Sequence, residues 1–303
     1  MSANRISRPC TPWSKSCWPN RPEARTSICM SRTRPSTHRR CLGALLAAFA
    51  LGTHQPVWAE DGPGTKPAAP LVLAGEDDWP PYSTAEKPGA DTQRPPVGFS
   101  VDLIRAALAT QGVQVQIVTV PFSRCMLYAK TGQVAGCFNA TITDDNRNDY
   151  VWHQPAMFEE ELSIFGRADD PSPEMRLSDL RGKRVAYTNG YTYPSEFMHD
   201  ARIQKFSAVS DAALIRMLLS KRVDYILLNR TPAWLRIDNT PEFRGQLRRT
   251  GLISMDGFWV AFSKQHPQGE RLAQQFSQGL AQMRKDGSYQ RLVDEFRRRV
   301  RYR

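Results

Sequence analysis

A helix followed at once by a buried strand is encoded in residues 211–229, DAALIRMLLSKRVDYILLN. Leu214, Met217 and Leu218 recur with the spacing of one face of an amphipathic helix, which we expect at 211–220. Residues 222–229 are apolar on both faces, which is typical of a strand in a parallel sheet covered by helices on its two sides. The stretch therefore predicts an α/β fold.

The same alternation extends along the chain in both directions. Short apolar or alternating runs predict strands, whereas longer runs with a period of 3.6 residues predict helices. Strands that alternate with helices form parallel sheets. Two more helices are expected at the end of the chain, separated by a break at Asp286-Gly287. We expect the other strands at residues 71–74, 113–117, 133–139 and 184–188, and the other helices at 97–110 and 121–130.

The charge of the chain is concentrated at its two ends. The formal net charge is +11, but residues 1–59 hold nine Lys and Arg against one Glu, and residues 60–303 hold 32 against 29. Five arginines fall within the last seven residues. A protein that binds DNA or RNA needs its basic excess across a folded face. We therefore expect no nucleic-acid partner.

The N-terminal segment has the pattern of a secretory signal peptide. Basic residues precede the apolar run 42–51, and Val57-Trp58-Ala59 is suited to cleavage before Glu60. The apolar run is about half of the roughly 20 residues that a membrane span needs. A signal of 59 residues is too long, so the start codon is expected at Met30. Residues 60–70 are a Gly/Pro/Ala linker, and export predicts a periplasmic protein.

Removal of residues 1–59 leaves two of the six cysteines, Cys125 and Cys137. An even number of cysteines in an oxidising compartment suggests a disulfide, although two buried free thiols are nearly as compatible with the sequence. The five histidines are scattered, and no His or Cys pair has the spacing of metal ligands. We expect no metal and no cofactor.

Four motifs of the mature chain resemble, in order and spacing, those of the bacterial family-3 extracellular solute-binding proteins, the periplasmic receptors of polar amino-acid ABC importers. The resemblance covers about residues 71–298. Each motif is weak alone, and their order gives the resemblance its strength. The motifs are LAGEDDWPPY (73–82), VGFSVDL (97–103), LSDLRGKRV (177–185) and DGSY (286–289).

The resemblance implies a type II periplasmic binding protein with two α/β lobes, two crossover strands and one central ligand cleft. The crossovers are expected near 158–167 and 254–263. Lobe 1 would comprise residues 71–161 and 255–303, and lobe 2 residues 162–254. The implied protein is a monomer that clamps a small polar, amino-acid-like or carboxylate solute and delivers it to an ABC permease in the inner membrane.

The family keeps a Thr-x-x-Arg motif whose arginine grips the ligand carboxylate with its planar fork of donors. Here Thr141 and Thr143 precede Arg147, and the spacing from Thr143 is one residue too long. We expect Arg147 to hold the ligand. The alternative is a surface arginine paired with Asp144 or Asp149.

Other site residues follow from the same resemblance. Trp79 and Tyr82 would stack on the ligand, unless they are ordinary core aromatics. Glu76 would face the ligand side chain, unless it is an exposed loop carboxylate. The turn Gly190-Tyr191-Thr192 in lobe 2 would offer backbone N–H groups to the carboxylate.

Asn229 departs from the family pattern. Relatives that bind α-amino acids usually place an aspartate at the end of this strand to pair with the α-ammonium group. An amide accepts a hydrogen bond but carries no charge. Either Glu196 or Asp224 compensates, or the ligand is not an ordinary α-amino acid.

Two other functions remain open beside transport. Some relatives with this fold are dehydratases, but the sequence contains no Ser/His/Asp order, metal set or phosphate loop. Glu76 and Glu196 are the only candidates for a general acid, so we predict that the protein is not an enzyme. A sensory module that reports its ligand to a membrane partner fits the sequence equally well.

Overall fold

The computed structural model describes residues 71–85 and 96–300, which belong to one compact unit of the chain. The predicted signal peptide, residues 1–59, and linker, residues 60–70, lie outside the described residues. Within the described ranges, no helix combines the length and the apolar character that crossing a membrane requires.

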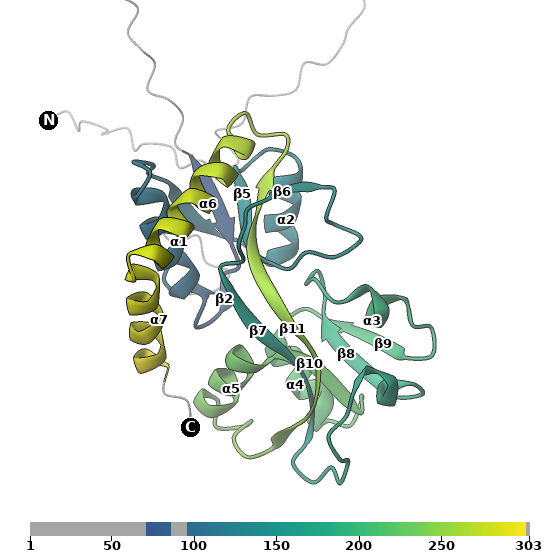
Figure 1. Ribbon diagram of the computed structural model, residues 1–303. Helices are drawn as coiled ribbons and strands as arrows, with labels where there is room; N and C mark the ends of the chain where they lie inside the picture. Colours follow the sequence, from purple (N-terminus) through teal and green to yellow (C-terminus); the bar gives the residue numbers. More distant parts are fainter. Residues whose placement is uncertain (1–70, 86–95, 301–303) are drawn as a thin grey trace, which may run out of the picture. The chain divides into compact units, whose positions relative to one another are not determined.

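One continuous sheet connects the two lobes (Figure 1). Its strands are β1 (Val72–Gly75), β4 (Gln116–Thr119), β5 (Gly136–Ala140), β6 (Tyr150–Trp152), β7 (Phe158–Arg167), β8 (Arg184–Thr188), β9 (Gln204–Ala208), β10 (Tyr225–Asn229) and β11 (Leu247–Ser263). Their order is β4-β1-β5-β11-β7-β10-β8-β9, with β6 paired to β11. The short strands β2 (Asp78–Trp79) and β3 (Ser83–Thr84) form a separate hairpin.

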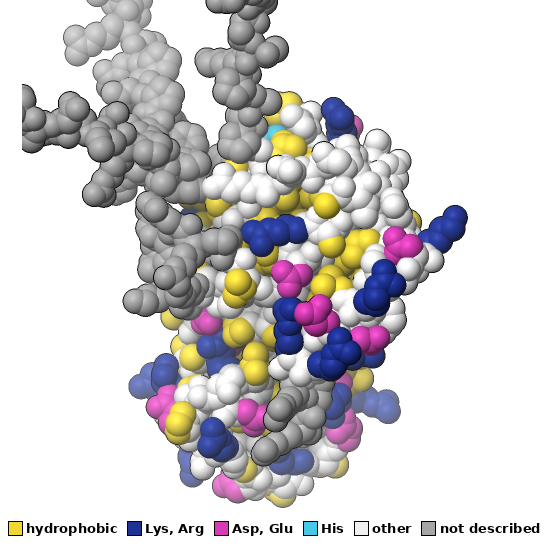
Figure 2. All heavy atoms as spheres, turned by 90° about the vertical axis from the view of Figure 1, so that its left-hand side faces the viewer, with side chains coloured by type: hydrophobic (Ala, Val, Ile, Leu, Met, Phe, Trp, Pro, Cys, Tyr) yellow, Lys and Arg dark blue, Asp and Glu magenta, His cyan; other side chains and the backbone are white. Residues whose placement is uncertain are grey.

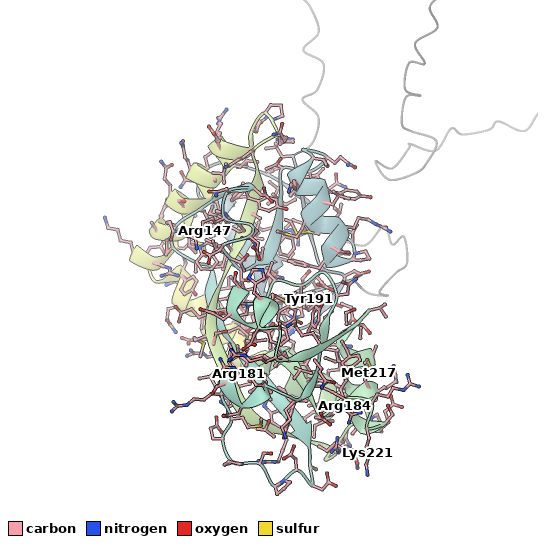
Figure 3. All side chains as sticks on the ribbon, turned by 90° about the vertical axis from the view of Figure 1, so that its right-hand side faces the viewer. Arg147, Arg181, Arg184, Tyr191, Met217 and Lys221 are labelled. Atoms are coloured by element: carbon pink, nitrogen blue, oxygen red, sulfur yellow. A yellow bond between two sulfur atoms is a disulfide. The ribbon has the colours of Figure 1, made fainter. Side chains whose placement is uncertain are left out.

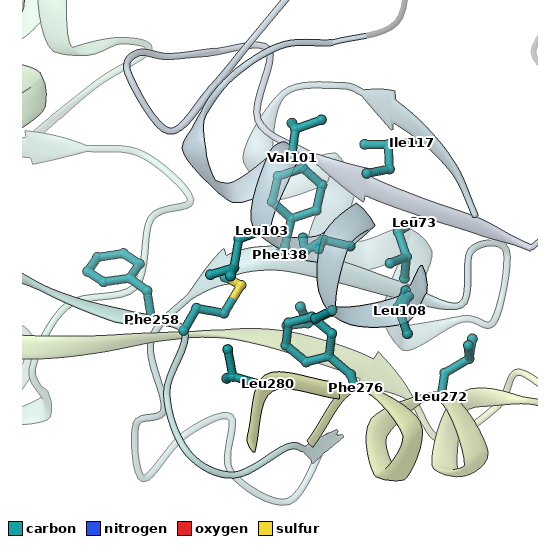
Figure 4. Packing of buried hydrophobic residues seen from close by; sticks show 14 of the residues in the cluster. Leu73, Val101, Leu103, Leu108, Ile117, Phe138, Phe258, Leu272, Phe276 and Leu280 are labelled. Atoms are coloured by element: carbon teal, nitrogen blue, oxygen red, sulfur yellow. The ribbon is translucent and has the colours of Figure 1, made fainter. Parts of the chain in front are cut away.

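Lobe 1 is built on the parallel strands β4, β1 and β5. Its helices are α1 (Phe99–Ala109), α2 (Phe122–Lys130), α6 (Gly269–Lys285) and α7 (Ser288–Arg299). Helices α1 and α6 bury their apolar faces on the same core as the strands, as Figure 4 shows for Leu73, Val101, Phe138 and Phe276. Burial of such side chains is the main favourable contribution to folding.

Lobe 2 is built on the parallel strands β9, β8 and β10. Its helices are α3 (Ser195–His199), α4 (Asp211–Leu219), α5 (Arg230–Asn239) and a 3₁₀ helix, Leu177–Leu180. One hydrophobic cluster lies under α4 and α5, and another lies under α3 and the 3₁₀ helix. Residues 225–228 of β10 are buried, so the strand is covered on both faces, as its sequence predicts. The predicted fold class is confirmed.

The crossover strands β7 and β11 run antiparallel to each other and join the lobes (Figure 1). Strand β7 coincides with the expected first crossover, Phe158–Arg167. Strand β11 begins earlier than expected, at Leu247, because its first half pairs with β7 before its second half pairs with β5. The exact lobe boundaries, 71–161 with 255–303 and 162–254, stay a prediction.

The structure joins Cys125 of α2 to Cys137 of β5 in a disulfide. Both side chains are fully buried in lobe 1, and their Cα atoms are 5.5 Å apart, a usual separation for a disulfide. The bond fastens α2 to β5 at the second residue of the strand, which ends at Ala140 just before Thr141.

Candidate functional site

A cavity lies where the two lobes meet. Its volume is about 20 Å³, room for about one water molecule. Six of the ten predicted site residues line it: Glu76, Trp79, Thr141, Tyr191, Thr192 and Asn229. The remaining lining residues are Phe122, Asn139, Leu162, Asp256 and Phe258. Residues from both lobes and from both crossover strands therefore share one site.

Trp79 forms part of an aromatic wall of the cavity. Its ring is 3% exposed and lies 5.1 Å from that of Phe258 and 4.7 Å from that of Tyr82. Tyr82 does not line the cavity. It stacks on Phe158 at 4.5 Å, and its hydroxyl donates to the Glu160 carboxylate. Tyr82 is therefore a core aromatic, which is the alternative that the sequence left open.

Arg147 lies outside the cavity lining. Its side chain is 55% exposed and forms an ion pair with Asp144, which is the alternative that the sequence left open. Figure 3 shows Arg147 on lobe 1, apart from Tyr191. Asn146 takes the inward position instead, because its Nδ2 donates to the Thr141 carbonyl at 2.9 Å and its Oδ1 accepts from the Thr143 N–H at 2.8 Å. Asn146 is thus anchored within the loop, and the adjacent Arg147 side chain extends into solvent.

The turn of lobe 2 meets lobe 1 directly. The Thr141 hydroxyl donates to Thr192 Oγ1 at 2.6 Å. Gly190 has φ +82°, and a Cβ atom placed there would lie 2.6 Å from Ser123 Cβ, which is too close. Glycine therefore serves both the left-handed turn and the close approach of the lobes. Neither Gly190 nor Thr143 lines the cavity.

Tyr191 of lobe 2 reaches Glu76 of lobe 1. The Tyr191 hydroxyl donates to the Glu76 carboxylate, and its ring lies 5.5 Å from that of Phe122 in an edge-to-face arrangement. Burial raises the pKa of Glu76 well above its usual value, and the nearby Asp211 carboxylate raises it further. Burial likewise raises the pKa of Tyr191 well above its usual value.

Two more carboxylates belong to the surroundings of the cavity. Asp256 lines the cavity from β11, burial raises its pKa, and Ser254 donates to it at 2.9 Å. Asp211 is 4% exposed, accepts from Thr188 Oγ1 at 2.6 Å, and has its pKa raised by burial. Arg236 donates to Asp78 at 3.0 Å, which connects α5 to the β2–β3 hairpin of lobe 1.

Asn139 interrupts the strand pairing at the edge of the cavity. Val260 pairs with Phe138 and Trp259 with Ala140, so Asn139 lies in a bulge, with φ 66°. Bulges of this kind often aim a side chain at a functional site. Asn139 Oδ1 accepts from the Ser100 hydroxyl at 2.6 Å, but its buried Nδ2 has no partner. The buried Nε1 of Trp79 also has none.

A model of the bacterial extracellular solute-binding proteins, family 3, matches residues 71–298. The chain belongs to this family. Its two lobes and crossover strands are thus those of a family-3 solute-binding protein. No curated protein matches the chain.

Solved structures with the same fold include binding proteins and a sensor domain. A histidine kinase sensor domain with similarity to periplasmic binding proteins is 25% identical, with a TM-score of 0.63, covering 75% of this chain and 95% of that one. A mutant of ArgBP from T. maritima is 22% identical (TM-score 0.62; 75% and 94% covered). An amino-acid ABC transporter substrate-binding protein from Streptococcus pneumoniae, bound to L-arginine, is 18% identical (0.61; 77% and 96%).

Five lining residues of this family-3 protein were not expected from its sequence. Phe122 follows Pro121 at a helix start, which is a weak signal for a site residue. Asp256 is a charged residue in the expected second crossover, 254–263, which is a signal that could have identified it but was not used. Asn139, Leu162 and Phe258 lie in apolar stretches and carry no such signal. Glu196 contributes to a different surface, beside Arg181 and His199, and does not replace Asn229.

Proposed function

We propose that the protein is a periplasmic receptor that clamps one small polar solute between its two lobes and delivers it to an ABC importer. The observation that carries this proposal is the cavity itself, because its lining draws on both lobes. A solute that contacts both sides binds the closed form better than the open form, and this difference drives closure. The disulfide is suited to the oxidising periplasm.

An amino-acid-like ligand fits this lining better than a plain organic acid does. Glu76 and Asp256 attract an ammonium group, and the rings of Trp79 and Phe258 accommodate an apolar stem. An organic acid brings only negative charge to these carboxylates. Arg147 is not required for this proposal.

The proposed partners are the solute and an inner-membrane permease, with the receptor acting as a monomer. Nucleic acid is not proposed. On the face shown in Figure 2, Lys and Arg side chains are interspersed with Asp and Glu rather than gathered into a basic patch. A nucleic-acid surface needs such a patch to neutralise phosphates.

A sensory role is the second candidate, and the similarity to a histidine kinase sensor domain favours it. Both roles require the same clamping of a solute. Permease and ATPase genes beside the gene of this protein would support transport, whereas a kinase gene would support sensing.

Thermal unfolding of the mature chain, from Glu60 onwards, tests the receptor role. The panel contains amino acids, amines, organic acids and sugars. A ligand at 100 times its dissociation constant stabilises the folded state by about 2.7 kcal/mol, which raises the melting temperature by several degrees. Turnover of a bound compound contradicts the role, since we propose no catalysis. So does a panel in which nothing raises the melting temperature.

A further inference from the structure

We propose that the cavity selects a small organic cation that carries a neutral hydrogen-bond acceptor where an amino acid carries its carboxylate. Primary amides of amino acids have this chemistry. The inference rests on the proposed receptor function and specifies the class of its solute.

The charges of the lining favour a cation. Glu76 and Asp256 contribute two carboxylates, and among the described residues no Lys or Arg lines the cavity. Two guanidinium groups of the surroundings do not line the cavity. Arg147 pairs with Asp144. Arg236 donates through one Nη atom to Asp78, and its buried Nε has no partner. A ligand carboxylate would be buried beside two carboxyl groups and without a cationic side chain in the lining, which is costly. A ligand ammonium group would form charge-assisted hydrogen bonds with the same carboxylates.

The unpartnered donors point independently to a ligand acceptor. Asn139 is 5% exposed and Trp79 is 3% exposed, and both line the cavity. Neither Asn139 Nδ2 nor Trp79 Nε1 has a hydrogen-bond partner. Buried donors without partners are rare because each costs free energy. Both donors are neutral, so a carbonyl or hydroxyl oxygen satisfies them without burying a charge.

The bulge at Asn139 indicates that the surrounding structure holds this donor in position for a ligand. A non-glycine residue with positive φ costs free energy and persists where the surrounding structure enforces it, often at binding sites. The Ser100 hydroxyl fixes Asn139 Oδ1. This bond leaves Nδ2 as the atom available to a ligand.

Matched pairs of compounds test the inference by calorimetry and thermal shift on the mature chain. The pairs are amino acids and their primary amides, for example L-arginine with L-argininamide and L-alanine with L-alaninamide. We expect at least one amide to bind ten or more times more tightly than its parent acid. Acids that bind as tightly as their amides, or tighter, would overturn the inference.

Three variants test which side chains determine the affinity for the preferred amide. Asp256→Asn is expected to weaken binding of the preferred amide at least tenfold. Glu196→Gln removes one negative charge outside the cavity and is expected to change affinity less than twofold. Equal weakening by both variants would contradict a direct contact with Asp256. Arg147→Ala is expected to leave affinity unchanged, and a tenfold loss would instead bring a guanidinium to the ligand and overturn the inference.

The result separates this inference from the receptor function. If acids or sugars bind and the amides do not, the inference fails and the receptor stands. If no compound of the wider panel binds, the receptor function fails and the inference fails with it.

Discussion

Thr141 of lobe 1 and Thr192 of lobe 2 are joined hydroxyl to hydroxyl, at 2.6 Å between their Oγ1 atoms. The bond exists only while the lobes are closed against each other. Beside it, Gly190 approaches Ser123, and Tyr191 reaches Glu76. The contacts of the turn 190–192 with lobe 1 are therefore features of the closed arrangement.

Gly190→Ala is expected to hold the lobes apart. The new methyl group would lie 2.6 Å from Ser123 Cβ in this arrangement, and φ +82° is unfavourable for alanine. Small-angle X-ray scattering should show a larger radius of gyration for the variant than for the wild type.

The double variant Ser123→Gly/Gly190→Ala is the control for that experiment. It removes the steric clash and retains the backbone strain. We expect the radius of gyration to return to the wild-type value, while the free energy of unfolding stays about 1 kcal/mol lower. An enlarged radius in the double variant would contradict the clash as the cause.

Asn146 and Arg147 are adjacent in one loop, but we expect Asn146 to contribute more to the stability of the fold. Asn146→Ala removes two hydrogen bonds, to Thr141 and to Thr143, and should lower the free energy of unfolding by about 1–3 kcal/mol. Arg147→Ala removes an exposed ion pair, worth about 0–1 kcal/mol. Urea unfolding of both variants checks the order. A larger loss in Arg147→Ala would contradict the structure of the loop.

The Cys125–Cys137 disulfide should contribute to stability. In the chain-entropy model, a crosslink over 12 residues stabilises the fold by about 2–3 kcal/mol, so Cys125→Ala/Cys137→Ala should unfold at lower urea concentration. The denatured mature protein exported to the periplasm should show no reactive thiol before reduction and two afterwards. Two thiols before reduction would rule out the bond.

His153 should make stability depend on pH. Its Nε2 accepts from the Val260 N–H at 2.9 Å, and burial lowers its pKa from 6.5 to about 3, with the Arg284 charge acting in the same direction. Between these values the unfolded chain binds a proton that the folded chain excludes. The contribution is therefore fully present well above pH 6.5 and is lost progressively as the pH falls towards 3.

His153→Gln tests that dependence, because glutamine can accept the same hydrogen bond without titrating. Between pH 6.5 and 5, the wild type should lose about 1.5–2 kcal/mol more of its unfolding free energy than the variant. The comparison cancels the contributions of Glu76, Asp211 and Asp256, whose pKa values are raised in both proteins. Parallel pH profiles would show that His153 does not cause the dependence.

Local sequence patterns determined most of the fold. Strand β8 coincides with its predicted range, 184–188, and α4 differs by one residue at its end. Strand β4 begins three residues later than predicted, at Gln116, because Gln116 and Val72 are the first residues that pair between β4 and its partner β1. Periodicity reports which face a residue takes, whereas strand ends depend on a partner elsewhere in the chain.

The sequence by itself determined the α/β class, the family and the two cysteines of the mature chain, since these depend on residue types and spacings along the chain. The tertiary structure decided which residues line the cavity. Asp256 and Asn139 reach it through the pairing of β11 with β7 and β5, and the bulge at Asn139 exists only in that pairing. Arg147 is excluded because Asn146 bonds to Thr141 and Thr143 and turns the next side chain outward. Hydrogen bonds between distant segments aim these side chains, and the spacing of residues along one chain does not encode that direction.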